Sequence, residues 1–241
     1  MLAVSAGMDC AQYLSFDCAN KTLGWCIVEI RDMTDILHTL DTIIALIGVA
    51  TPVEILAAIK GVTRAIRSAV RLDCGVNDLL KGKRVADVSD LDRTRALRAF
   101  LDELGARHRV TPDTIIVIEH QPPKVGIASN TTTGAAMVEH QLLMYYSAHQ
   151  VRLASPKLKN NIRLSPELDI GLYFAQVGAR FRDKTDARKV HAADSLRYFT
   201  TRFGISVAHI NKSQLNHAGD AFLLMWAERA IARDEVGPSP S

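Results

Sequence analysis

The feature that most constrains the fold of this chain is a short, uninterrupted apolar run that ends in an acid. Residues Thr114–Glu119 have the sequence T-I-I-V-I-E, and Gln121-Pro122-Pro123 stops the run soon afterwards. The run has the length of a strand, and its lack of polar alternation is typical of a strand that is covered on both faces. We therefore expect Thr114–Glu119 to be a central strand of a sheet in the protein interior.

Further strands are predicted on either side of this run in the sequence. Tyr13–Asp17 and Leu23–Ile30 are apolar runs joined by Asn20-Lys21-Thr22, which predicts a β-hairpin. Ile36–Leu46 is predicted to extend this hairpin to an antiparallel meander of three strands. Val151–Ala154 is predicted to be a short strand that follows the central one along the chain.

Helices are predicted where apolar residues recur at a helical period or follow a capping residue. They are Pro52–Val70, Asp90–Ala106 with Asp90 as its cap, Thr133–His149, Lys184–Phe203 and His217–Arg233. Leu72–Val88 contains glycines and the basic cluster Lys81-Gly82-Lys83-Arg84, so it is predicted to be a loop. Strand and helix alternate in the second half of the chain, which predicts parallel pairing there and an α/β fold with a mixed sheet.

Length and composition suit an ordinary folded domain. The chain has 241 residues, of which 48% are hydrophobic and 23% charged. We expect one domain over residues 13–233, with a helical or loop insertion around 48–88, an extension at 1–12 and a disordered tail at 234–241. The longest uncharged apolar run, Thr42–Val53, is shorter than the about 20 residues that span a bilayer.

Cysteine usage and the first residues indicate an intracellular protein. The four cysteines form no CxxC pair and have no histidine at zinc-site spacing, which favours reduced thiols. Residues 1–12 lack the basic and apolar pattern of a signal peptide. We therefore expect no membrane association and no secretion.

Positive charge is concentrated in one part of the chain. Residues Arg152–Arg202 contain eleven Lys and Arg against five Asp and Glu, a net charge of +6, whereas the rest of the chain carries −3. A local positive field in a nearly neutral protein suits a polyanionic partner such as nucleic acid. The other interpretation is the solvated surface of two helices.

Three acids lie where packing alone gives little reason for a charge. Asp17 is in the first strand, Glu119 ends the central strand, and Asp220 is near the start of the last predicted helix. A buried carboxylate is costly unless it is paired or binds a metal. Converging carboxylates suit Mg²⁺ or Mn²⁺, and two such ions can hold a phosphoryl group during in-line displacement. Taken singly, Asp17 is also typical of a turn and Asp220 of a helix N-terminus.

A histidine accompanies the last of these acids. His217 precedes Asp220 by three residues, so the two share one helix face. This makes His217 a candidate metal ligand or proton carrier. His191 and Asp194 have the same spacing inside the predicted basic helix, where we expect Asp194 to be an ordinary surface acid.

Four motifs resemble the poxvirus-type Holliday junction resolvases, which are relatives of the bacterial RuvC-type and fungal mitochondrial resolvases. The motifs are S-F-D-C-A-N-K-T-L-G-W (Ser15–Trp25), I-V-I-E-H-Q-P (Ile116–Pro122), A-S-P-K-L-K-N (Ala154–Asn160) and N-H-A-G-D-A-F (Asn216–Phe222). The motifs are short, but their order and spacing together are fairly specific. The resemblance covers most of the chain apart from about residues 48–88 and the tail.

The resemblance implies a fold and an activity. It implies an RNase H-like fold, a two-fold homodimer, and Mg²⁺-dependent (or Mn²⁺-dependent) symmetric nicking of four-way DNA junctions with two metal ions per site. The family's metal-binding acids correspond to Asp17, Glu119 and Asp220. His217 stands where the poxvirus pattern has another Asp, a replacement also met among bacterial relatives. The resemblance further implies a virus-infected cell as the setting, without choosing between cytoplasm and nucleus.

DNA binding is expected to depend on phosphate contacts, which give affinity without reading sequence. The residues expected to make them are Lys21, Gln121, Lys124, Lys157, Lys159, Arg188 and Lys189. Each basic residue, taken alone, is also typical of a solvated surface, and the cluster Lys81–Arg84 is either a further DNA contact or a solvated linker. The predicted helix Thr133–His149 has an apolar stripe, formed by Ala135, Val138, Leu142 and Tyr145, that is either a dimer face or ordinary core.

Other function classes remain open at this stage. One is a different RNase H-like nuclease that acts on RNA–DNA hybrids or branched DNA. Another is a catalytically inactive protein that binds junctions. A third is a sugar-kinase or actin-like ATPase, but the segment Asp17–Asn20 lacks the glycines of a phosphate loop and the chain is short for two lobes.

Overall fold

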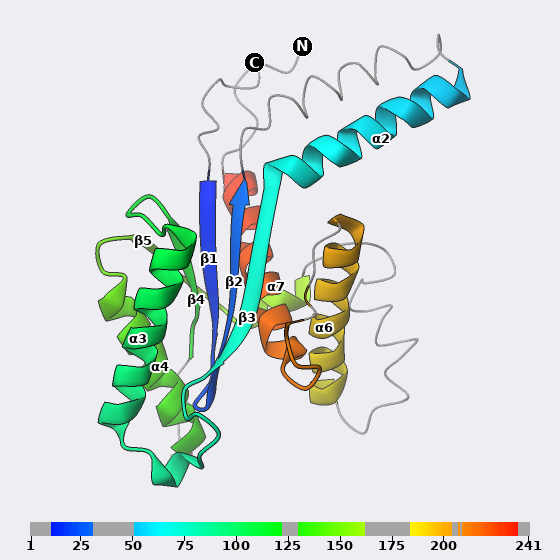
Figure 1. Cartoon of the computed structure of the whole chain (residues 1–241). Coiled ribbons are helices and arrows are strands. Elements are labelled where there is room, and N and C mark those ends of the chain that lie inside the picture. Colours follow the sequence, from blue (N-terminus) through cyan, green and yellow to red (C-terminus); the bar gives the residue numbers. More distant parts are fainter. Residues whose placement is uncertain are drawn as a thin grey trace.

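The structure is a computed structural model of the chain, and it describes residues 11–30, 51–121, 130–161, 184–203, 207 and 209–235. Five strands form one sheet in the order β3-β2-β1-β4-β5 (Figure 1). The strands are β1 (Ala11–Cys18), β2 (Thr22–Ile30), β3 (Val70–Asp78), β4 (Ile115–Glu119) and β5 (Gln150–Ala154). β1, β2 and β3 pair antiparallel, whereas β4 pairs parallel with both β1 and β5. This confirms the mixed five-stranded sheet, in the arrangement that the RNase H-like resemblance implies.

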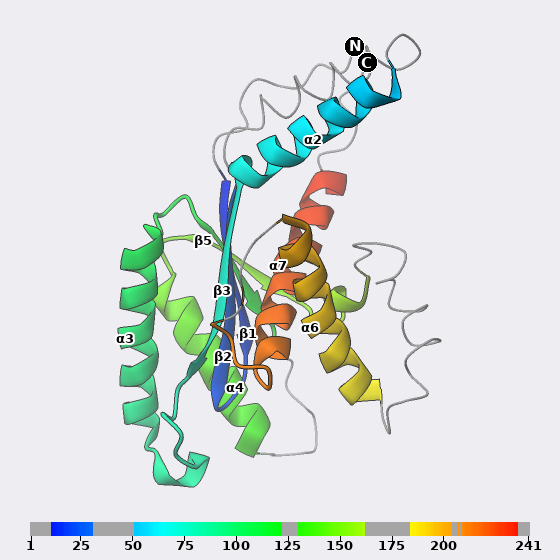
Figure 2. The same cartoon turned by 45° about the vertical axis from the view of Figure 1, so that its right-hand side comes forward.

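Helices cover both faces of the sheet. They are α2 (Pro52–Ala69), α3 (Asp90–His108), α4 (Asn130–Tyr145), α6 (Lys184–Phe203) and α7 (Leu215–Glu235). α3 and α4 lie on one face, whereas α7 lies on the other and is packed against α6 (Figure 2). α2 leads into β3 and projects beyond the sheet (Figure 1). No described helix is long and apolar enough to cross a membrane.

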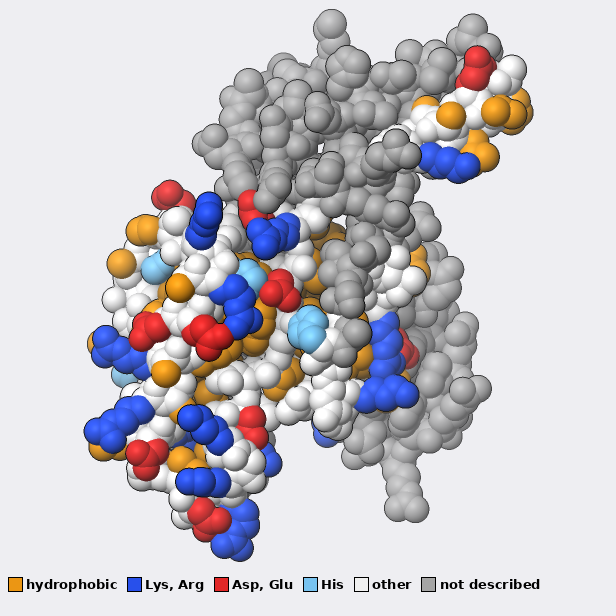
Figure 3. Space-filling view, in the orientation of Figure 1, with side chains coloured by type: hydrophobic (Ala, Val, Ile, Leu, Met, Phe, Trp, Pro, Cys, Tyr) orange, Lys and Arg blue, Asp and Glu red, His pale blue; other side chains and the backbone are white. Residues whose placement is uncertain are grey.

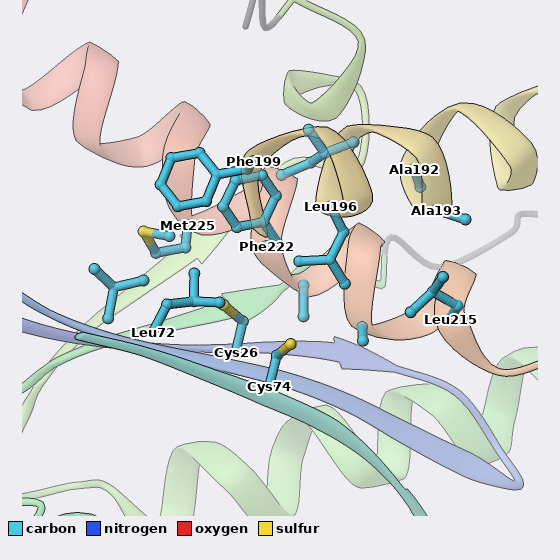
Figure 4. Close-up of a cluster of buried hydrophobic side chains, with 14 of the residues drawn as sticks. Cys26, Leu72, Cys74, Ala192, Ala193, Leu196, Phe199, Leu215, Phe222 and Met225 are labelled. Carbon is cyan, nitrogen blue, oxygen red and sulfur yellow. The ribbon is translucent and has the colours of Figure 1, made fainter. Parts of the chain in front are cut away.

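The alternation of side chains along the strands divides the core into two layers. On β1, Leu14 and Phe16 contribute to the cluster under α3 and α4, and both are fully buried. The opposite face carries Cys26 and Cys74 from β2 and β3, which face α6 and α7 (Figure 4). Because successive residues point to opposite faces, Ser15 and Asp17 of β1 lie on the α7 side.

The third strand of the sheet corrects the prediction for its region. Val70–Asp78 is a strand, although most of it was expected to be a loop inside an insertion. Its turn-forming residues Asp73, Gly75 and Asn77 are tolerated because β3 is at the sheet edge and pairs along its whole length with β2. The predicted third strand, Ile36–Leu46, lies outside the described residues.

The other predicted elements are confirmed within a few residues. β4 is buried along most of its length, as a central strand should be. α3 has Ser89 as its N-cap instead of Asp90, because the Ser89 hydroxyl accepts the backbone N–H of Asp92 at 3.1 Å. The extension was predicted at residues 1–12 and the disordered tail at 234–241. Residues 11–12 belong instead to β1 and residues 234–235 to α7, while residues 1–10 and 236–241 lie outside the described part of the chain.

Candidate active site

Two of the three predicted acids lie side by side at the carboxyl ends of parallel strands. The register of β1 and β4 pairs Phe16 with Ile118, so Asp17 and Glu119 follow on neighbouring strands. The preceding residues, Phe16 and Ile118, point into the core under α3 and α4. Because successive side chains of a strand alternate between faces, Asp17 and Glu119 point to the face that α7 covers. Each side chain is only 9% exposed. Carboxylates this deeply buried require a compensating cation.

Two glycines allow α7 to approach closely enough to complete the site. Gly24 is the register partner of Asp17 on β2, and a Cβ atom there would lie 2.3 Å from the backbone oxygen of His217. A Cβ atom at Gly219 would lie 2.3 Å from the backbone oxygen of Ala192 on α6. Neither approach is compatible with a side chain. The start of α7 therefore lies against β2 at Gly24, beside Asp17 of β1.

A buried serine also attaches α7 to the sheet. The Ser15 hydroxyl, which is fully buried, donates to the backbone oxygen of Ala221 at 2.7 Å. Ser15 lies two residues before Asp17 on the same face of β1, and Ala221 follows Asp220. This bond therefore fixes the position of Asp220 relative to Asp17.

The centre of the site is occupied by the ammonium group of Lys159. This residue lies in the short helix η2 (Leu158–Asn161) that follows β5. Its Nζ atom lies 2.9 Å from Glu119 Oε1, 3.1 Å from Asp17 Oδ1 and 3.4 Å from Asp220 Oδ1. The side chain is 11% exposed. The three predicted acids therefore converge on one cationic position.

His217 is the fourth predicted member of the site, and it also lies there. Its Nδ1 atom is 3.1 Å from Asp17 Oδ2. Its Nε2 atom is 3.5 Å from the Thr22 hydroxyl, at the start of β2. The imidazole is thus held between the carboxylate of β1 and the hairpin turn.

Burial and mutual repulsion raise the pKa of two of the three carboxyl groups. Burial, together with the negative charge of Asp17, raises the pKa of Glu119 to about 8. The same two causes raise the pKa of Asp220 to about 6. At neutral pH, Glu119 therefore holds a proton, while Asp220 is mostly ionised.

Asp17 is the carboxylate that stays ionised most strongly. Burial opposes its ionisation, but the charge of Lys159 and the hydrogen bond with His217 outweigh that effect and lower the pKa of Asp17. The pKa of Lys159 is raised, because its three carboxylate neighbours outweigh its own burial. The site is therefore organised around an Asp17–Lys159 ion pair.

A further buried acid, Glu139, which the sequence analysis did not single out, is linked to Glu119 through Gln121. Glu139 on α4 lies 2.9 Å from His120 Nδ1 through one oxygen, and its other oxygen accepts the Gln121 N–H at 2.7 Å. The Gln121 side chain in turn donates to Glu119 Oε2 at 3.2 Å. The only signal in the sequence was an acid within the predicted apolar helix stripe. Glu139 therefore positions the segment that carries Glu119.

The residues predicted to contact DNA occupy several environments. Lys159 is within the carboxylate cluster, and Gln121 contacts Glu119. Lys21, Lys157, Arg188 and Lys189 are exposed, the last two on α6. Lys124 lies outside the described residues. Their contact with DNA stays a prediction.

Two other predictions about helices can be compared with the structure. Asp194 is on α6 and forms an ion pair with Arg197 at 3.1 Å, as expected of a surface acid. The apolar stripe of α4 belongs to the core. Ala135, Val138 and Leu142 are buried, Val138 and Leu142 pack with side chains of the sheet and α3, and Tyr145 is partly buried against the same cluster. The core interpretation of this stripe therefore holds in place of the dimer face.

The donor set fits a hard divalent cation. Three carboxylates and one imidazole offer oxygen and nitrogen ligands of the kind that Mg²⁺ and Mn²⁺ take. In the described part of the chain, no group of three or more His, Cys, Asp or Glu side chains has the arrangement that would hold a metal ion. The Lys159 ammonium lies between the carboxylates and supplies a single positive charge at the position where they converge.

Comparison with known proteins gives a structural likeness and no match in sequence. No protein-family model matches the chain, and no curated protein matches it. The fold is similar to that of RuvC from Thermus thermophilus, with a TM-score of 0.46 and 12% identity. It is also similar to T. thermophilus RuvC in complex with Holliday junction substrate, with a TM-score of 0.48 and 11% identity. Each comparison covers 93% of this chain and 96% of the RuvC chain. What this chain does must therefore be inferred from the side chains of its own site.

Proposed function

We propose that the protein is a divalent-metal-dependent DNA endonuclease that resolves four-way junctions by paired, symmetric nicks. The observation that supports this proposal is the convergence of Asp17, Glu119 and Asp220, with His217, from three separate elements on one cationic position. Burying such a cluster is costly unless positive charge compensates it, and clusters of this kind gather at functional sites. The motif resemblance to junction resolvases supports branched DNA as the substrate.

The residues of the cluster have distinct roles in this proposal. Asp17, Glu119 and Asp220 (or His217) would hold the divalent cations. Divalent cations lower the pKa of an attacking water and stabilise the charge on the leaving oxygen. Glu119 must lose its proton before it can act as a ligand, so cation binding releases a proton near neutral pH.

Lys159 and Glu139 have supporting roles. Lys159 neutralises part of the cluster's charge in the metal-free protein, which keeps the carboxylates together. Glu139 holds the backbone at Gln121 and so limits the orientations that Glu119 can take. Both act on the ligands before any substrate is bound.

The homodimer belongs to the same proposal. A four-way junction has two-fold symmetry, and nicks at two related positions require two copies of the site. A dimer with one site per protomer would deliver both nicks in one binding event.

The test is incubation of the protein with a synthetic four-way junction, a plain duplex and an RNA–DNA hybrid, each with and without Mg²⁺. We expect paired nicks in the junction only, and only with Mg²⁺. Asp17→Asn should abolish nicking while junction binding persists, and the matched control Asp194→Asn, on the surface of α6, should nick normally. Nicking that survives in Asp17→Asn would refute the proposed chemistry. Cleavage of the hybrid instead of the junction would point to a different nuclease, and binding without any cleavage to an inactive scaffold.

A further inference from the structure

A tight turn after β3 presents basic residues at the same end of the sheet as the candidate active site. β1 ends beside Asp17, and β3 ends at Asp78 on the same side of the sheet, because the two strands run in the same direction on either side of β2. Lys81 and Lys83 follow in the turn, and both are exposed. Figure 3 shows blue Lys and Arg side chains, interspersed with red carboxylates, at this lower end of the molecule.

The turn is fixed by its own hydrogen bonds. The Asp78 carboxylate accepts the Leu80 N–H at 3.0 Å and the Gly82 N–H at 2.8 Å. Lys81 and Gly82 have φ angles of 51° and 82°, in the left-handed region. Leu79 and Leu80 are almost completely buried. The lysines therefore project from a rigid base.

The same turn is joined to the β1–β2 hairpin. The Leu79 N–H donates to the backbone oxygen of Lys21 at 2.9 Å, so the exposed Lys21 lies next to this turn. Asp78 is the register partner of Thr22, whose hydroxyl is 3.5 Å from His217 Nε2. A continuous set of contacts therefore links the three lysines to the active site.

Within the described part of the chain, these lysines form no ion pair with the acids around them. Arg84 is paired with Asp87, and in α3 Asp90 lies 3.6 Å from Arg93 and Asp92 lies 3.7 Å from Arg95. The Asp78 carboxylate is occupied by backbone N–H groups. Among the described residues, no carboxylate is within ion-pair distance of the three lysines, which are Lys21, Lys81 and Lys83.

The separation from the site matches a DNA backbone that runs across this end of the molecule. β3 and β1 are two strand spacings apart, which is about 10 Å. One DNA strand advances about 3.4 Å along the helix axis per nucleotide, so this separation is about three nucleotides. Because a lysine side chain is long and flexible, the contacted phosphate can lie somewhat nearer to or farther from the cleaved bond than about three nucleotides.

We propose that Lys21, Lys81 and Lys83 form a phosphate-binding platform that holds the backbone of a duplex arm about three nucleotides from the cleaved bond. The proposal rests on the proposed function, since it assigns the path of the DNA beside that site. It commits the turn after β3 to a DNA contact and excludes the solvated-linker interpretation of Lys81–Arg84.

The test measures junction binding to the Asp17→Asn protein over a series of salt concentrations in EDTA. A second protein adds Lys81→Asn and Lys83→Gln, since asparagine tolerates the left-handed φ at position 81. A third adds Lys81→Arg and Lys83→Arg, which keep both charges. The matched control adds Lys60→Gln and Arg71→Gln instead, which remove two exposed cations outside the turn. Arg71 lies about 24 Å from Asp78, near the other end of β3.

Loss of two phosphate contacts should reduce the slope of log affinity against log salt by about 1.8, or roughly 60-fold in affinity at 0.1 M salt. The arginine variant and the matched control should keep the original slope. An unchanged slope in the Asn/Gln variant overturns the platform even if the unmutated protein nicks junctions. If the protein binds junctions with the expected slopes but never nicks them, only the proposed function fails. No junction binding at all would overturn both.

Discussion

Stability of the metal-free protein should fall as pH rises from 5 to 8, which is the opposite of what ordinary carboxylates produce. Glu119 has a pKa of about 8 when folded, against 4.5 for an unperturbed glutamate. The folded protein therefore binds a proton more tightly than the unfolded chain, and stability present below pH 4.5 is lost as pH rises through 8. A difference of this size corresponds to at most roughly 5 kcal/mol.

Neighbouring groups change this expectation little. The raised pKa of Asp220, about 6, has the same sign but acts mainly below pH 6. The lowered pKa of Asp17 gives stability that is lost only as pH falls below 3.8. The raised pKa of Lys159 gives stability that persists until well above pH 10. Glu119 therefore controls the decline between pH 6 and 8.

The assay is equilibrium urea unfolding in EDTA at pH 5, 6, 7 and 8. Between pH 6 and 8, the free energy of unfolding of the unaltered protein should fall with a slope approaching about 1.4 kcal/mol per pH unit, whereas Glu119→Gln should give a nearly flat profile over the same interval. Below pH 6 both proteins should share the decline that comes from Asp220. Glu103→Gln, an exposed glutamate on α3, is the matched control and should keep the decline. Mg²⁺ should stabilise the protein more at pH 8 than at pH 6, because it binds the ionised carboxylate. Equal slopes for Glu119→Gln and the unaltered protein would refute the reasoning.

Two substitutions test the other supports of the site. Lys159→Met should destabilise the metal-free protein by roughly 3 kcal/mol and make Mg²⁺ raise its melting temperature more than in the unaltered protein, because the buried carboxyl groups of Asp17 and Glu119 and the partly exposed one of Asp220 lose the ammonium group that lies between them. Lys157→Met, exposed two residues away, should do neither. Equal melting curves for the two variants would contradict this role of Lys159. Gly24→Ala should lower the free energy of unfolding in urea by about 1–3 kcal/mol and reduce nicking, because its Cβ would meet the His217 backbone. The control Gly105→Ala, on α3 with open space around it, should leave stability unchanged or increase it. A Gly24→Ala protein as stable and active as Gly105→Ala would show that α7 does not need this approach.

The parts of the fold that could be predicted are those whose sequence pattern is local. β4 is a continuous apolar run, and the helices have either a clear period or a clear cap. β3 was missed because its residues favour turns when considered alone, and only pairing with β2 along its whole length makes them a strand. An edge strand of this kind is specified by its neighbour as much as by its own residues.

The acids of the site could be predicted for a similar reason. Asp17, Glu119 and Asp220 are charges in apolar surroundings, so each is conspicuous in the sequence. Lys159 was placed among the DNA contacts, because Lys157 and Lys159 look equivalent in a short polar segment. The turn of η2 after β5 decides which of the two points inward.

The site is assembled from residues at opposite ends of the chain. Asp17 and His217 are 200 positions apart, yet their side chains are in contact. A ribosome makes the sheet residues long before it makes α7, so a nascent chain carries Asp17 and Glu119 without the partners that α7 provides. On the proposed function, cutting activity would appear only after the last helix has been synthesised and has docked, and unfinished or prematurely terminated chains would leave DNA intact.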